Sequence, residues 1–186
     1  MITISFTGHR PSKLNNCYNW DNPIIPLISK ALEEHILDII GTYTEITFIT
    51  GAALGVDQIA FWTVHKMKKK YPHLKIRNVI AVPYKDQPKA WPSYSQEWYG
   101  KMLNLADDII YVDTISAYKF GLPEGTHSNV KLQKRNEYMV DHSDFVIAVW
   151  NFTPGGTGNC VNYATTKGKR IRIINSDPIL LEVLKK

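Results

Sequence analysis

Short runs of strand-forming residues alternate with longer amphipathic runs along the chain, and this alternation constrains the fold most strongly. In the longer runs, apolar residues recur near positions i, i+3, i+4 and i+7, which is the spacing of an amphipathic helix. Regular alternation of this kind predicts βαβ units and a mostly parallel sheet. The expected strands are ITISF (2–6), EITFIT (45–50), RNVIAVP (77–83), DIIYV (108–112), DFVIAVW (144–150) and RIRII (170–174).

The expected strands are mostly continuous apolar runs, as is typical of a sheet covered by helices on both faces. We therefore predict an α/β fold, a three-layer α/β/α sandwich around a Rossmann-like, mostly parallel sheet. With 186 residues and 44% hydrophobic residues, the chain can form one core, so a single domain over residues 1–186 is expected. The expected helices cover residues 24–40, 55–70, 94–106, 128–142 and 158–168.

Composition excludes several classes of protein. No run approaches the ~18 consecutive apolar residues of a membrane span, and the first ten residues do not resemble a secretion signal, so we expect a cytoplasmic protein without a membrane partner. Cys17 and Cys160 show no metal-ligand spacing, so both are expected as free thiols and neither a metal nor a cofactor is predicted. The net charge of +5 helps to attract anions but is too small to make nucleic acid the expected partner.

The first expected strand ends in a polar turn that contains Thr7, Gly8, His9 and Arg10. In open parallel sheets, ligands bind beyond the carboxyl ends of the strands, where this turn would lie. A glycine lets backbone amides approach an anion, and His9 and Arg10 can donate hydrogen bonds to it. The sequence thus predicts these four residues in a ligand site, against the alternative of an ordinary glycine turn.

A second turn of small residues leads from the second strand directly into a helix. It contains Gly51, Ala52, Gly55, Asp57 and Gln58, all of which we expect near the ligand. Such a turn aims the free N–H groups of a helix start at an anion, although this one matches neither a Walker A loop nor GxGxxG. Asp57 would repel phosphate, so it either caps the helix or accepts a hydrogen bond from a ribose or base.

A third turn follows the fifth strand and again opens a helix. Its Gly155, Gly156 and Thr157 form a second candidate anion site, in which Thr157 either caps the helix or binds a phosphate oxygen. Two such turns on neighbouring loops are more specific than one, since the alternative requires both to be ordinary βα connections. We therefore expect all three residues to bind the ligand.

The helix before the fifth strand and the segment after the third strand supply further candidates. Arg135 and Asn136 are expected to reach the ligand, although Arg135 is also explained by a solvated helix surface. Pro83 and Tyr84 are expected beside it. Aromatic residues on the latter segment, which include Trp91, either stack on a base or cover the edge of the sheet. Three connections are long enough to suggest function: residues 8–22, 84–94 and 113–127.

These motifs together resemble a known superfamily. The run from Arg135 through Gly158, with its PGGTG turn, resembles the signature of LOG-type phosphoribohydrolases, and the turn from Gly51 to Asp57 resembles the equivalent loop of DprA/Smf proteins. Both groups belong to the SLOG superfamily, and the Thr7 to Pro11 opening resembles its bacterial and phage branch, which includes YpsA-like proteins. The resemblance covers most of residues 1–175 and implies a Rossmann-like fold that binds nucleotides or their derivatives.

One departure from the LOG pattern bears on chemistry. Arg135 matches the family's arginine, but Asn162 occupies the position of the glutamate in PGGxGTxxE, and Asn159 that of its threonine. An asparagine cannot serve as a carboxylate base. If the chain is nevertheless a hydrolase, the catalytic candidates are Arg135 and an acid that replaces the missing glutamate, either Asp57 or Glu137.

Two main hypotheses therefore stand. The favoured one is a protein that senses or sequesters a small nucleotide-type ligand, such as an ADP-ribose or a cyclic nucleotide. The alternative is a LOG-like phosphoribohydrolase that cleaves the N-glycosidic bond of a nucleoside monophosphate. Binding of single-stranded DNA, as in DprA, is a weaker third. Because such families often pair through helices, the resemblance also suggests a homo-oligomer.

Overall fold

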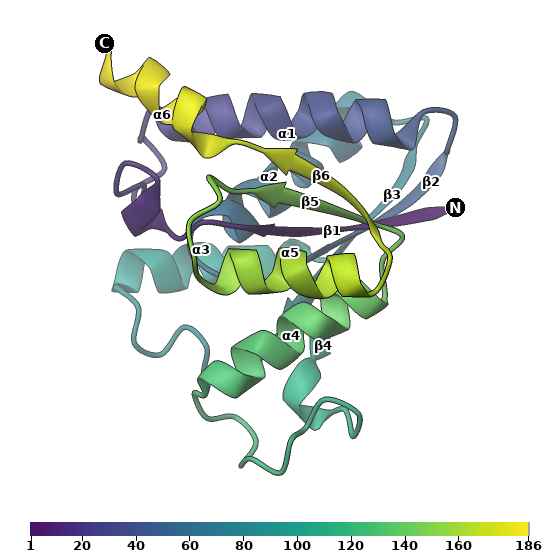
Figure 1. Ribbon diagram of the computed structural model, residues 1–186, viewed down its shortest axis with the longest axis vertical. Helices are drawn as coiled ribbons and strands as arrows, with labels where there is room; N and C mark the ends of the chain where they lie inside the picture. The colour runs from purple at the N-terminus through teal and green to yellow at the C-terminus, as the bar shows by residue number, and fades with distance from the viewer. Residues whose placement is uncertain (186) are drawn as a thin grey trace.

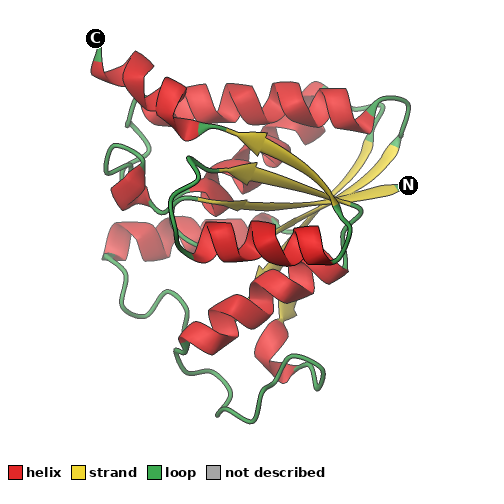
Figure 2. Ribbon diagram, viewed as in Figure 1, coloured by secondary structure: helices red, strands yellow, loops and turns green. Residues whose placement is uncertain are grey.

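The protein is built around a parallel sheet, as a computed structural model that describes residues 1–185 shows (Figures 1 and 2). Within these residues the sheet has six strands in the order β4-β3-β2-β1-β5-β6, and every neighbouring pair is parallel. The predicted Rossmann-like α/β class is thus confirmed. The strands are β1 (Ile2–Gly8), β2 (Glu45–Thr50), β3 (Lys75–Val82), β4 (Asp108–Tyr111), β5 (Phe145–Val149) and β6 (Arg170–Ile174).

Helices cover both faces of the sheet, which confirms the three-layer arrangement. One layer contains α1, α2, α3 and α6, and the other contains α4 and α5, which cross in front of the strands in Figure 1. The helices are α1 (Ile24–Ile40), α2 (Val56–Lys70), α3 (Ser93–Leu105), α4 (Asn129–Asp141), α5 (Gly156–Thr166) and α6 (Ser176–Leu184), with short 3-10 turns η1 (Pro11–Lys13) and η2 (Val112–Thr114).

The two core layers follow from the alternation of side chains along each strand. In β1, Ile4 and Phe6 are fully buried against α1 and α2, and Phe6 stacks on Phe48 of β2 with ring centroids 5.7 Å apart. On the opposite face of the sheet, Val146 of β5 packs with residues of α4 and α5. Burial on both faces explains why the strands read as continuous apolar runs.

The strand order places a crevice between β1 and β5. From β1 to β4 the chain moves steadily outward in one direction, and then α4 carries it back across the sheet so that β5 pairs with β1. The connections after β1 and β5 therefore leave toward opposite faces of the sheet. This is the topological switch point at which open α/β sheets bind ligands.

The sequence did not predict α6, which packs beside α1 at the C-terminal end of the chain. Its start is fixed by Asn175, whose side chain accepts a hydrogen bond from Asp177 N at 3.0 Å. Pro178 stands in the first turn of the helix, where its missing N–H costs nothing. None of the helices in residues 1–185 combines the length and apolar character of a membrane span.

Candidate functional site

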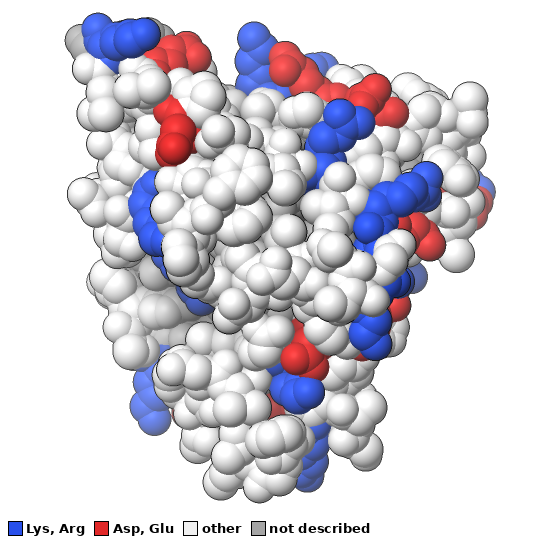
Figure 3. All heavy atoms as spheres, in the orientation of Figure 1, with Lys and Arg blue, Asp and Glu red and all other residues white. Residues whose placement is uncertain are grey.

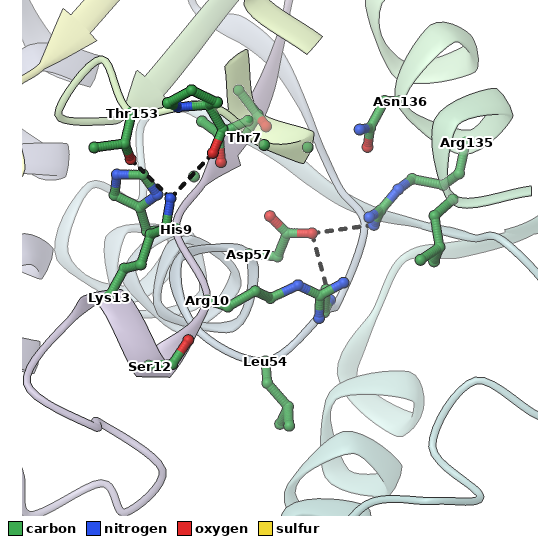
Figure 4. A pocket seen from close by; sticks show the side chains of 17 residues that line it. Thr7, His9, Arg10, Ser12, Lys13, Leu54, Asp57, Arg135, Asn136 and Thr153 are labelled. Carbon is green, nitrogen blue, oxygen red and sulfur yellow. Dashed lines mark hydrogen bonds and ion pairs between the residues drawn. The ribbon is translucent and has the colours of Figure 1, made fainter. Parts of the chain in front are cut away.

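A cavity of about 280 Å³ lies at the carboxyl ends of the central strands, at the switch point (Figure 4). Three loops, which follow β1, β2 and β5, meet around it, and α4 closes one side. Ten of the sequence-predicted residues line it: Thr7, Gly8, His9, Arg10, Asp57, Arg135, Asn136, Gly155, Gly156 and Thr157. The other lining residues are Ser12, Lys13, Ala53, Leu54, Leu132, Thr153 and Pro154.

The loop after β1 contributes cations to this cavity because η1 turns the chain back toward the sheet. Lys13, which the sequence did not single out, reaches across to the loop after β5 and donates to Thr153 Oγ1 at 2.8 Å and to Pro154 O at 3.1 Å (Figure 4). Its ammonium group thus joins two walls of the cavity. The signal that could have found Lys13 is its place in the long connection of residues 8–22.

His9 is held in the cavity wall by Asn151. His9 Nε2 lies 2.6 Å from Asn151 Oδ1, and it lies 3.2 Å from Asn151 N, which donates to it. Asn151 Nδ2 in turn donates to Asp177 Oδ1 at 2.9 Å. Burial lowers the pKa of His9 and outweighs the Asn151 hydrogen bond, which raises it, so His9 is uncharged at neutral pH.

A buried ion pair connects α2 and α4 at the back of the cavity. Arg135 Nη1 lies 3.0 Å from Asp57 Oδ2, and the two side chains are only 5% and 8% exposed. Figure 4 shows the Asp57 carboxylate between the guanidinium groups of Arg10 and Arg135. The pairing explains why an acidic residue is compatible with an anion site, since Asp57 balances a buried arginine.

Gly51 makes room for this ion pair. A Cβ at Gly51 would lie 1.1 Å from Arg135 Nη1 and 2.6 Å from Asp57 Oδ2, so any side chain there would displace the guanidinium. Gly51 does not line the cavity; it lies behind Arg135. Its function is to permit the close approach of α4 to the loop after β2.

Gly55 holds the loops after β1 and β2 together in a similar way. Its φ is +97°, and a Cβ would lie 2.4 Å from His9 O, which accepts a hydrogen bond from Val56 N at 3.2 Å. The start of α2 is thereby anchored to the loop after β1. Gly55, like Gly51, was predicted near the ligand but is not among the residues that line the cavity. Both glycines support the loops that form it.

The electrostatics of the cavity favour an anion. Its lining includes Arg10, Lys13 and Arg135 against a single carboxylate, Asp57. Arg10 is an exposed residue of the cavity lining; burial lowers the pKa of its guanidinium, and Asp57 opposes the shift. At the opposite wall, α5 begins at Gly156, so the free N–H groups of its first turn add the positive end of a helix dipole.

The remaining predicted residues lie around the cavity and do not line it. Ala52 adopts a φ of +52°, and its carbonyl accepts from Gln58 Nε2 at 3.3 Å, so both support the loop after β2. Pro83 is buried just after β3. Glu137 accepts from Lys134 Nζ at 2.7 Å.

Two further cavities adjoin the first. One, of about 470 Å³, shares Arg10 and Leu132 with it and contains Tyr84. The other, of about 680 Å³, lies between α4 and α5, and Asn162 lines it. No Asp or Glu is among the described residues that line this last cavity, so its polar groups are amides, hydroxyls and the guanidinium of Arg10.

Both cysteine thiols are buried, and the described residues contain no cluster of metal ligands. Cys17 and Cys160 are free and buried, and burial raises the pKa of each thiol to about 11. Between residues 1 and 185 we find no group of three or more His, Cys, Asp or Glu side chains placed to hold a metal ion.

Comparison with known proteins assigns the chain to a family. Residues 4–178 match the family model described as the YspA SLOG family. The chain belongs to this family. The SPbeta prophage-derived protein YoqJ of Bacillus subtilis is 46% identical over 77% of this chain and 83% of its own length. A UPF0398 protein of Ligilactobacillus salivarius is 30% identical over 78% of this chain and 72% of its own length.

Solved structures of the same superfamily share the fold of this YspA SLOG protein. DNA processing protein A (DprA) of Streptococcus pneumoniae superimposes with a TM-score of 0.62 at 13% identity, over 100% of this chain and 56% of that chain. DprA of Helicobacter pylori, whose structure is described for its single-stranded DNA binding mode, gives 0.57 at 15% identity, over 99% of this chain and 72% of that chain. The predicted SLOG membership is thus confirmed.

Proposed function

We propose that the chain binds a small nucleotide or nucleotide-derived ligand, of the ADP-ribose or cyclic-nucleotide type, and so senses or sequesters it. The observation that carries the proposal is the convergence of three cations and the N-terminus of α5 on one cavity at the switch point. Membership of the YspA SLOG family supports a nucleotide-related role.

The ligand phosphate fits best between α5 and the loop after β1. The first turn of α5 offers free N–H groups, and Lys13 and Arg10 supply charge from the opposite side. Asp57 and Asn136 then provide polar groups for ribose hydroxyls on the α4 side of the cavity. This arrangement supports a ligand with at least one phosphate and one sugar.

Titration calorimetry with AMP, ADP, ADP-ribose and cyclic AMP tests the proposal. We expect binding by at least one of them, weakened at least tenfold by Arg10→Ala, because a charge-assisted hydrogen bond to phosphate is lost. Lys30→Ala is the matched control, since Lys30 is an exposed cation that pairs with Glu34 on α1. Absence of binding by every nucleotide at millimolar concentration would reject the proposal.

Hydrolysis of an N-glycosidic bond is less well supported than binding. Of the described residues that line the first cavity, only Asp57 carries a carboxylate, and Arg135 holds it in an ion pair. The LOG glutamate position, Asn162, is exposed in a neighbouring cavity. Chromatography after incubation with AMP should therefore show no free adenine; release of the base, lost in Asp57→Asn, would favour the hydrolase.

Single-stranded DNA is a second candidate ligand, favoured by the likeness to DprA. On the face seen in Figure 3, however, Lys and Arg are interspersed with Asp and Glu and form no continuous basic stripe. Phosphate contacts release counterions, so true DNA binding weakens steeply with salt. Fluorescence anisotropy of a labelled oligonucleotide at 50 and 200 mM salt tests this candidate. We expect only weak binding at both salt concentrations; tight binding at 50 mM that weakens steeply at 200 mM would favour DNA.

A further inference from the structure

The second cavity, of about 470 Å³, lies directly beside the proposed phosphate site and differs from it in character. Three aromatic side chains contribute to its walls: Tyr84 and Trp91 from the connection after β3, and His127 from the segment before α4. Arg10 and Leu132 line both cavities, so the two lie side by side. One ligand can therefore occupy both, with Arg10 at the junction.

The aromatic rings are held in place by their neighbours. The Tyr84 and His127 rings meet edge to face, with centroids 5.6 Å apart, and Trp91 meets the buried Tyr99 in the same way at 5.4 Å. Trp91 itself is only half-buried, which leaves part of its indole facing the cavity. Fixed rings around a hollow of this size suit a flat aromatic group.

Gln87 also lines this cavity, and its side-chain oxygen is a buried hydrogen-bond acceptor. The side chain is 5% exposed, and its Nε2 donates to Gly51 O at 3.4 Å, which orients the amide. Its Oε1 has no hydrogen-bond partner among residues 1–185. A buried acceptor without a partner is costly, and a donor on a bound ligand would satisfy it.

We infer that the second cavity binds the nucleobase of the ligand, and that a base with an exocyclic amine, such as adenine, is preferred. The inference rests on the proposed function, since it requires the phosphate to occupy the first cavity. Trp91 and His127 would pack against the ring, the guanidinium of Arg10 would lie between base and phosphate, and Gln87 Oε1 would accept from the amine. The ligand class is thus an adenine nucleotide.

Calorimetry with ribose 5-phosphate, AMP and inosine monophosphate measures how much the base and the phosphate each contribute to the affinity. We expect AMP to bind at least tenfold more tightly than either, because ribose 5-phosphate has no base and hypoxanthine replaces the amine with a carbonyl. Trp91→Ala and His127→Ala should each weaken AMP at least fivefold and leave ribose 5-phosphate unchanged. His127 is exposed, so its removal does not disturb the core.

Trp98→Ala is the matched control, because this half-buried tryptophan packs on Trp20 and Trp62 outside the cavity. It should leave the affinity for AMP as it is. Equal binding of ribose 5-phosphate and AMP, unaffected by Trp91→Ala and His127→Ala, would overturn the inference while the phosphate site stands. If AMP, inosine monophosphate and ribose 5-phosphate all fail to bind while ADP-ribose or cyclic AMP binds, the inference is overturned and the proposed function stands; if none of the nucleotides binds, both are rejected.

Discussion

Gly51 is the residue on which the geometry of the site depends most directly. In Gly51→Ala the new methyl group would occupy the position of Arg135 Nη1, and the guanidinium would have to leave Asp57. We expect a loss of about 1–3 kcal/mol in the free energy of unfolding, as for other overpacked sites, together with a marked loss of nucleotide affinity. Urea unfolding and calorimetry measure the two effects.

Gly100→Ala provides the control for this substitution. Gly100 lies within α3, and a Cβ there meets no atom within 4 Å. Alanine is the better helix former, so Gly100→Ala should raise the free energy of unfolding by up to about 1 kcal/mol and leave binding unchanged. Full affinity in Gly51→Ala would contradict the role given to the Arg135 position.

The free energy of unfolding should depend on pH through His9. Burial lowers the pKa of His9 in the folded chain below its ordinary value of 6.5, so in acid the unfolded chain binds more protons. The free energy of unfolding should therefore be constant with respect to His9 above pH 6.5 and should fall as the pH drops from 6.5 toward the folded pKa. Unfolding in urea at pH 7.5 and 5.5 measures this slope.

His9→Gln should make that slope shallower without abolishing it. Burial lowers the pKa of His65 as well, with Lys69 and Lys68 acting in the same direction, so His65 contributes a slope of the same sign. An unchanged pH dependence in His9→Gln would show that His9 is not held neutral. The double variant with His65→Gln then reports what the two histidines contribute together.

Residue by residue, the site was predictable where it follows strand ends and unpredictable where it depends on long-range pairs. The turns that contain Arg10 and Gly156 could be located because both come directly after strands. The pairing of Asp57 with Arg135 joins positions 78 apart in the chain, and no local pattern encodes it. Glu137, the other candidate acid, does not line the cavity and accepts a hydrogen bond from Lys134.

At the scale of elements, one buried ion pair fixes the connection that precedes α4. Lys131 Nζ lies 2.8 Å from Asp113 Oδ2, each side chain is 2% exposed, and Asp113 also accepts from Gly125 N at 2.9 Å. Lys131 donates to Pro123 O as well. The segment of residues 115–128 is thus attached to α4 and η2 and carries His127 to the second cavity.

Lys131→Met should remove this attachment. It leaves the Asp113 carboxylate buried without a counterion, and breaking a buried pair in this way costs about 3–5 kcal/mol. Denaturant unfolding measures the loss, and limited proteolysis should cleave first within residues 115–128. The double variant Lys131→Met with Asp113→Leu should recover most of the stability; equal loss in the single and double variants would exclude an uncompensated charge as the cause.

The elements themselves were largely predictable, and their differences have local causes. The strand expected over residues 108–112 ends at Tyr111 because Val112 begins η2. The helix α6 was not predicted because its run is short and carries too few apolar positions to establish a helical period. Long amphipathic runs such as α1 were located to the residue, since the 3.6-residue period persists over four turns.

For the molecule as a whole, a ligand that binds only the folded chain should raise its melting temperature. At a nucleotide concentration 100 times Kd, linkage adds about 2.7 kcal/mol to the free energy of unfolding. A chain of this size shifts by about 2–4 °C per kcal/mol, so we expect a rise of about 5–11 °C. Differential scanning calorimetry with AMP checks this, and Arg10→Ala under the same ligand concentration should show a clearly smaller rise.

The position of β1 between β2 and β5 has a consequence for how the protein is made. β2 can pair with β1 as soon as residue 50 has emerged, but the partner on the other side is complete only at residue 149, and the site's last loop follows it. Translation adds about 5–20 residues per second, so the edge of β1 that pairs with β5 stays unpaired for roughly 5–20 s in the nascent chain. The cavity at the switch point is therefore incomplete until the loop after β5 has been made, and under the proposed function a growing chain cannot bind its nucleotide before that loop emerges.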